Sequence, residues 1–306
     1  MRTLACFAAA GMLAVVAFHA NAATTAYGEA FDTLYKIDLD ARTATTVGVS
    51  TTSSGGTPVK GLGGLTTMPD GSLYAVSNAL KLLVKIDPTS GATSVVGNLN
   101  LEGQGTGQFD ALDLGMAADG HGVVWLSSGT AQKLWRVDPS SGSLTFVGST
   151  GHGISGLVAR DDALYGSGDL TDHTFYRIDK GTGAATPIGS FGPAAPAALN
   201  SVSMSFDADG TLWAVLNYVP PAVGTTVPDW SDLATIDPAS GLMTVLGPIT
   251  GPESLRGIGM KGFTTGPARA AAAAASPAPI GSPWALGLLG LLLTFVGMRS
   301  VRRVGL

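Results

Sequence analysis

The chain has 306 residues, of which 43 are Gly and 17 are Pro, and charged residues make up only 13%. This composition favours a turn-rich, all-β protein over a helical one. The single cysteine, Cys6, lies near the N-terminus, which excludes an intramolecular disulfide and a thiolate metal site from the rest of the chain.

Residues 1–22 have the pattern of a signal peptide. Arg2 is followed by the apolar run LACFAAAGMLAVVAF, and HANA before Ala23 fits an A-x-A cleavage pattern. We therefore expect an exported protein whose mature chain begins at residue 23.

A thirteen-residue pattern then occurs five times. Its copies are KIDLDARTATTVG from Lys36, KIDPTSGATSVVG from Lys85, RVDPSSGSLTFVG from Arg136, RIDKGTGAATPIG from Arg177 and TIDPASGLMTVLG from Thr235. Apolar residues alternate on both sides of a turn in which Asp can bond backbone amides, Pro presets φ and Gly supplies a left-handed residue. Each copy therefore predicts a β-hairpin.

A second, weaker pattern precedes four of the hairpins, at residues 61–77, 110–128, 153–168 and 200–217. It has a strand rich in small residues, a turn such as Asp-Gly, and a strand that contains Tyr74, Trp125, Tyr165 or Trp213. We expect the small residues to surround a narrow axis and the aromatic residues to form the core between repeats. The repeats are roughly 40 to 60 residues long and each predicts four strands, which is typical of β-propeller blades.

The two ends of this region complement each other. The first repeat lacks an inner strand, whereas residues 253–263 have the inner-strand pattern without a following hairpin. Pairing of 253–263 with 24–29 would complete a fifth blade and remove an exposed sheet edge. We predict an all-β, five-bladed β-propeller over residues 23–263, closed by its terminal strands and without a helix longer than about two turns.

The remaining C-terminal residues have a different composition. Residues 264–283 are rich in Ala and Pro and predict a linker. The apolar run WALGLLGLLLTFVGM follows, and then an Arg cluster, which together predict a membrane helix over residues 284–306. The apolar run would rise about 22 Å as a helix, and its Arg cluster favours a cytoplasmic end.

This tail resembles the C-terminal sorting signals of Gram-negative bacteria that exosortase-type transpeptidases recognise, the PEP-CTERM and IPTL-CTERM group. It is most similar to the IPTL-CTERM form, which has Ser-x-Trp before the membrane segment, although Ala-Pro-Ile-Gly replaces the Ile-Pro-Thr-Leu box. The residues that carry the resemblance are Pro279, Ser282, Pro283, Trp284, Arg299, Arg302 and Arg303. The resemblance implies anchoring in the inner membrane, processing by a sorting transpeptidase, and a final place at the cell surface or outside the cell. The alternative is an unprocessed tail anchor.

Without its ends the chain is strongly acidic. Five of the 17 Lys and Arg residues lie in the two terminal segments, which leaves 12 against 22 acidic residues, a net charge of about −10. Such a surface repels nucleic acid. We therefore expect a neutral or cationic partner.

Motifs for catalysis or metal binding are nearly absent. The Asp-Gly turns at Asp70, Asp119 and Asp209 lack the spaced carboxylates of an EF-hand, and we interpret them as tight turns. His121, His152 and His173 have no metal-ligand spacing. We expect neither a metal nor a cofactor.

The irregular segments 50–60, 100–110, 190–199 and 217–232 all join strands on the same face of a propeller, which we call the long-loop face. The opposite, short-turn face carries the Asp-Gly and hairpin turns. Because binding loops vary in length on a rigid scaffold, we expect ligands on the long-loop face. The candidate ligand-binding residues are Lys60, Asp110, Asp113, His152, Asn200 and Arg256 near the starts of inner strands, and Tyr218 and Trp230 in the 217–232 insertion.

Two functions remain open at this stage. The first is a surface or matrix protein that binds a glycan, peptide or protein without catalysis. The second is a propeller-type hydrolase or lyase with its active site in the axial channel. The second requires the six candidates near the inner strands to converge in one pocket.

Overall fold

The structure is a computed structural model, and it describes residues 24–105, 112–168, 172–196, 199–218, 231–251 and 260–268. These residues form strands and turns and no helix, so within them no helical segment could span a membrane. The predicted signal peptide, most of the linker and the predicted sorting tail lie outside the described residues.

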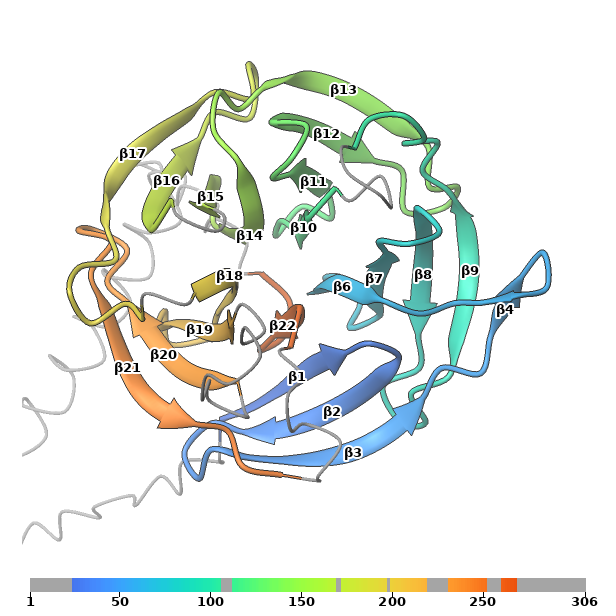
Figure 1. The fold of residues 1–306 in the computed structure, drawn as a ribbon, viewed down its shortest axis with the longest axis horizontal. Coiled ribbons are helices and arrows are strands. Elements are labelled where there is room, and N and C mark those ends of the chain that lie inside the picture. The colour runs from blue at the N-terminus through green and yellow to red at the C-terminus, as the bar shows by residue number, and fades with distance from the viewer. Residues whose placement is uncertain are drawn as a thin grey trace, which may run out of the picture. The chain divides into compact units, whose positions relative to one another are not determined.

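Five four-stranded antiparallel sheets stand around a common axis as the blades of a propeller (Figure 1). Blade 1 contains β22 (Gly262–Thr264), β1 (Thr25–Ala30), β2 (Thr33–Asp38) and β3 (Thr43–Val49). Blade 2 contains β6 (Leu62–Thr67), β7 (Leu73–Ser77), β8 (Leu82–Ile86) and β9 (Thr93–Asn98). Blade 3 contains β10 (Leu114–Ala118), β11 (Val124–Ser128), β12 (Lys133–Val137) and β13 (Leu144–Ser149).

Blade 4 contains β14 (Ile154–Arg160), β15 (Ala163–Gly168), β16 (Thr174–Ile178) and β17 (Ala185–Ser190), and blade 5 contains β18 (Leu199–Phe206), β19 (Leu212–Tyr218), β20 (Asp232–Ile236) and β21 (Met243–Pro248). The prediction of five blades is confirmed. A small hairpin of β4 (Ser53–Ser54) and β5 (Thr57–Pro58) lies inside the segment 50–60, where the sequence predicted only an irregular loop.

The predicted closure of the ring is confirmed at Gly262 and Phe263, whereas residues 253–259 of the predicted closing strand lie outside the described residues. β22 pairs with β1 through Glu29 opposite Gly262, Gly28 opposite Phe263 and Tyr27 opposite Thr264. The described chain does not stop at residue 263 but continues in contact with the propeller to Ala268. The described fold therefore includes residues 264–268 of the segment predicted as linker.

The repeated hairpin turn has the expected chemistry. In blade 2 the Asp87 carboxylate accepts hydrogen bonds from the amides of Thr89 at 2.7 Å and Ser90 at 3.1 Å, and Gly91 has a φ of 70°. The Thr89 hydroxyl also donates to this carboxylate at 2.6 Å, and its bond, together with those of the amides, lowers the pKa of Asp87 below its usual range. In blade 1 the position of the turn glycine is taken by Arg42, with a φ of 53°.

The glycine that ends the repeated hairpin has, in four of the five copies, a role that sequence reasoning missed. A Cβ built on Gly97 would collide with the carbonyl oxygen of Ser141, in the hairpin turn of the next blade. Three further pairs show the same relationship: Gly48 with Ser90, Gly148 with Thr182 and Gly189 with Ser240. Backbone therefore meets backbone between blades, where only glycine fits. Figure 1 shows the outer strands following one another round the ring.

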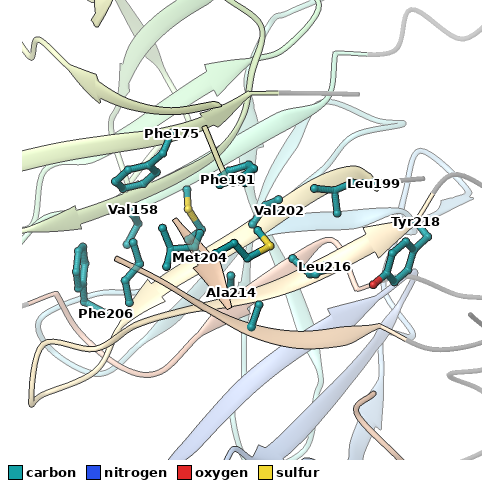
Figure 2. Close-up of a cluster of buried hydrophobic side chains, with 14 residues drawn as sticks. Val158, Phe175, Phe191, Leu199, Val202, Met204, Phe206, Ala214, Leu216 and Tyr218 are labelled. Atoms are coloured by element: carbon teal, nitrogen blue, oxygen red, sulfur yellow. The ribbon is translucent and has the colours of Figure 1, made fainter. Parts of the chain in front are cut away.

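Each gap between neighbouring blades holds a hydrophobic cluster. Figure 2 shows the cluster between blades 4 and 5, where Val158 and Phe175 face Met204, Ala214 and Leu216. The aromatic residues predicted as core lie in or against these clusters, as Trp125 does between blades 3 and 4. The prediction that they pack between blades is confirmed.

Candidate functional site

The axis is closed at the short-turn face by residues 264–268, which we call the plug. The Thr264 and Thr67 hydroxyls lie 2.9 Å apart, and the Thr265 amide donates to Ser205 Oγ at 3.0 Å. The Thr265 hydroxyl also donates to the Phe206 carbonyl at 2.6 Å, while Ala268 packs on the cluster between blades 3 and 4. The plug therefore joins the closing strand to the other four blades.

A ring of five buried residues, one from each blade, lines both of the small cavities along the axis. The ring consists of Leu65, Met116, Leu157, Met204 and Phe263. The cavity on the long-loop side has a volume of about 10 Å³ and is lined by Ser155, Ser203, Lys261 and glycines. The other cavity, above the plug, has a volume of about 20 Å³. Each cavity has room for about one water molecule and is too small for a small-molecule ligand.

Polar side chains surround the mouth of the axis on the long-loop face. Lys261 Nζ lies 3.5 Å from Asp113 Oδ1, with 43% and 35% of the two side chains exposed. Asn200 Nδ2 donates to Asn217 Oδ1 at 3.0 Å, and Asn217 Nδ2 donates to the Met260 carbonyl at 3.4 Å. The mouth thus presents one compensated ion pair and amide groups, which suits ligands that donate and accept hydrogen bonds.

A chain of three titratable side chains lies on the long-loop face of blade 4. Tyr176 Oη donates to Asp172 Oδ2 at 2.7 Å and lies 3.0 Å from His152 Nδ1, and the two rings are 4.7 Å apart. Since the tyrosine proton points to Asp172, His152 Nδ1 must donate to the tyrosine oxygen, which leaves Nε2 as the acceptor in the neutral ring. We call these three residues the histidine relay.

Tyr218 does not offer an exposed aromatic contact. It is only 8% exposed, belongs to the core cluster of blade 5, and donates to Asp232 Oδ2 at 2.6 Å. Burial, together with the Asp232 carboxylate, raises the pKa of its hydroxyl above the usual range. This corrects the expectation that Tyr218 contacts a ligand from the surface (Figure 2).

The predicted candidates do not form one pocket in the described residues. Lys60 pairs with Asp32 at 3.7 Å on the rim, Asp113 and Asn200 lie at the mouth, and His152 lies in the relay. None of these four lines either axial cavity. The other candidates, Asp110, Arg256 and Trp230, lie outside the described residues.

Sequence reasoning missed Lys261, Asp172 and Tyr176. Lys261 could have been found, because it occupies the start of the closing inner strand, the kind of position that singled out Asp113. Asp172 and Tyr176 had no such signal, since their meeting with His152 depends on how two loops fold over blade 4.

The short-turn face has a structural arrangement of charges. Asp119 accepts from Trp125 Nε1 at 3.1 Å and from Lys180 Nζ at 2.8 Å, so it links blades 3 and 4. Burial alone would raise the pKa of Asp119, but the bonds from Lys180 and Trp125 hold it below the usual range. In the part of the chain that the structure describes, no group of three or more His, Cys, Asp or Glu side chains could hold a metal ion.

No family model matches the chain, and no curated protein matches it. Among solved structures, a catalytically inactive virginiamycin B lyase from Staphylococcus aureus with quinupristin is 17% identical, covers 77% of this chain and 74% of its own, and has a TM-score of 0.43. A nidogen/laminin complex is 14% identical over 78% of this chain and 97% of its own, with a TM-score of 0.48. A putative gluconolactonase is 15% identical over 79% and 82%, with a TM-score of 0.42. What those proteins bind or act on is not transferred to this chain.

Proposed function

We propose that the protein is an exported binding module, displayed at the cell surface or in the extracellular matrix, that captures its ligand on the long-loop face. The observation that carries the proposal is the position of the two chain ends. Thr24 bonds Leu39 and Asp40 beside the first hairpin turn, and Ala268 ends the plug, so both ends leave the propeller at the short-turn face. A tether attached at either of these points, Thr24 or Ala268, is attached on the side opposite the long-loop face.

The ligand that fits this face is a neutral or cationic glycan, peptide or protein. The exported part carries a net charge of about −10, and at the mouth of the axis Lys261 is already compensated by Asp113. Unlike charges steer partners together and like charges exclude them. Display would follow from anchoring of the predicted tail in the inner membrane and its processing by a sorting transpeptidase, with the simple tail anchor as the alternative.

A hydrolase or lyase is the second candidate. The apolar ring and the plug leave an active site inside the channel little space. The histidine relay favours an enzyme of a different layout, because a His that is oriented by a second side chain through Nδ1 and has Nε2 as its acceptor nitrogen is the usual form of a general base. Such a site would lie on the long-loop face, outside the axis.

Binding of the full exported chain to arrays of neutral, cationic and anionic glycans and peptides tests the proposal. We expect retention on neutral or cationic members and none on anionic ones. Preference for anionic ligands would contradict the proposal. Turnover of a retained ligand that His152→Gln abolishes would also contradict it, and would support the hydrolase or lyase.

A further inference from the structure

Glu29 is the one residue of the described structure with a buried side-chain oxygen that lacks a hydrogen-bond partner, its Oε2. The residue is 1% exposed. Buried polar groups are almost always hydrogen-bonded, because an unpaired one loses its bonds to water without replacement. An unpartnered carboxyl therefore requires an explanation.

The carboxyl lies on the strand pair that closes the ring. Glu29 stands opposite Gly262 in the pairing of β1 with β22, and its carbonyl accepts from the Lys261 amide at 3.0 Å. A Cβ on Gly262 would lie 3.4 Å from Glu29 Cβ and 2.7 Å from Leu65 Cβ of blade 2. Glu29 thus occupies the seam between blades 1 and 2, in space that the absence of a side chain at Gly262 leaves open.

The charged groups near this seam are engaged with each other. On the rim Lys60 pairs with Asp32, and Lys261, directly before β22, pairs with Asp113 of blade 3. Blade 2 contributes Leu62 and Leu65 to the seam, β2 contributes Leu34, and the remaining titratable neighbour on β1 is Tyr27. With no cation beside it among the described residues, burial raises the pKa of Glu29 well above its usual range and favours the neutral carboxyl.

We propose that the pair of β1 and β22 is a proton-sensitive clasp, which is closed while Glu29 is protonated and opens when Glu29 ionises. An ionised Glu29 must reach water, and β22 is the neighbour that can move most easily. It is held to β1 by three residue pairs, whereas β2 is held to β1 by six. The proposal is independent of the ligand and of the fate of the tail.

Opening of the clasp would also affect the plug. Thr264 is both the last residue of β22 and the first of the plug, so β22 cannot leave β1 without pulling on the bonds of Thr264 to Thr67 and of Thr265 to Ser205. Those bonds join blade 1 to blades 2 and 5. Proton loss at one buried carboxyl is therefore coupled to the contacts that hold the centre of the ring together.

Hydrogen exchange of the full chain, measured against pH, tests the clasp. Dividing the exchange rate of an amide by the rate of an unprotected amide gives the equilibrium constant for opening. At Phe263 and Thr264 of β22 this constant should increase by up to about tenfold per pH unit above the unfolded pKa of glutamate, about 4.3. The increase is expected because one proton is released on opening. Amides of the central strand β7 should stay much better protected than those of β22 at every pH, because they open only when the whole fold opens. The Glu29→Gln variant should remove the pH dependence at β22, whereas the exposed control Glu102→Gln should retain it.

A second variant, Glu29→Leu, covers the case in which Gln does not fold, since it replaces the carboxyl by an apolar group that suits the seam. The clasp is wrong if corrected exchange at β22 in the wild-type chain is independent of pH. It is also wrong if the Gln or Leu variant has the same slope as the wild type.

Discussion

The hydroxyl groups of Thr264 and Thr67 lie 2.9 Å apart at the short-turn end of the axis, although 197 residues separate them in the chain. Both residues are buried. The pair joins the closing strand of blade 1 to the inner strand of blade 2, and it marks the point at which the C-terminal segment becomes the plug.

The threonine pair gives the first prediction. Thr264→Val should lower the free energy of unfolding by about 1–3 kcal/mol, because it leaves a buried Thr67 hydroxyl unpaired. The double variant with Thr67→Val should be less destabilised than the sum of the singles, because it removes both polar partners. Urea unfolding measures both, with the exposed Thr51→Val as control. Additive losses would show that the two hydroxyls do not interact.

The glycine contacts between blades give the second prediction. Gly97→Ala forces a methyl group against the Ser141 carbonyl and should destabilise the protein by at least about 2 kcal/mol. Gly181→Ala is a suitable control, since a Cβ there would meet only the Asp179 carboxylate at 3.3 Å. Thermal unfolding compares the two. Equal melting temperatures would mean that neighbouring blades can move apart at no cost.

These two contacts also show what sequence can and cannot predict. The hairpins and the closing strand followed from local patterns of apolar residues, turn residues and small residues. The partner of Gly97 could not be predicted, because it lies in another repeat and its approach depends on the twist and spacing of the blades. The histidine relay and the burial of Tyr218 were missed for the same reason: both depend on how loops and blades meet.

Acid stability gives the third prediction. Bonds within their own turns lower the pKa values of Asp87, Asp138, Asp179 and Asp237 in the folded protein. A lowered folded pKa contributes stability above the unfolded value of about 3.9 that is lost as the pH falls through the folded value. The melting temperature should therefore decrease from about pH 4 downwards, and less steeply in Asp87→Ser. A melting temperature that stays constant down to about pH 2 would contradict this prediction.

Processing of the tail gives the fourth prediction. If residues 279–303 are a sorting signal, the mature protein should end near Ser282, and neutral replacements of Arg299, Arg302 and Arg303 should leave an uncleaved precursor. Mass spectrometry of surface-exposed protein measures the C-terminus. An intact C-terminus on that protein would favour the simple tail anchor.

The central claim is that ligands bind on the long-loop face, and the near absence of cysteine allows a direct measurement. After removal of residues 1–22 the chain contains no Cys, so a single cysteine can attach a bulky maleimide-polyethylene glycol group to either face. Lys60→Cys, where the side chain is 63% exposed, blocks the long-loop face, and Asp70→Cys blocks the short-turn face. On the array members that retain the unmodified protein, the group at position 60 should abolish binding while the group at position 70 leaves it unchanged. Binding that survives modification at position 60 and is lost at position 70 would contradict the account.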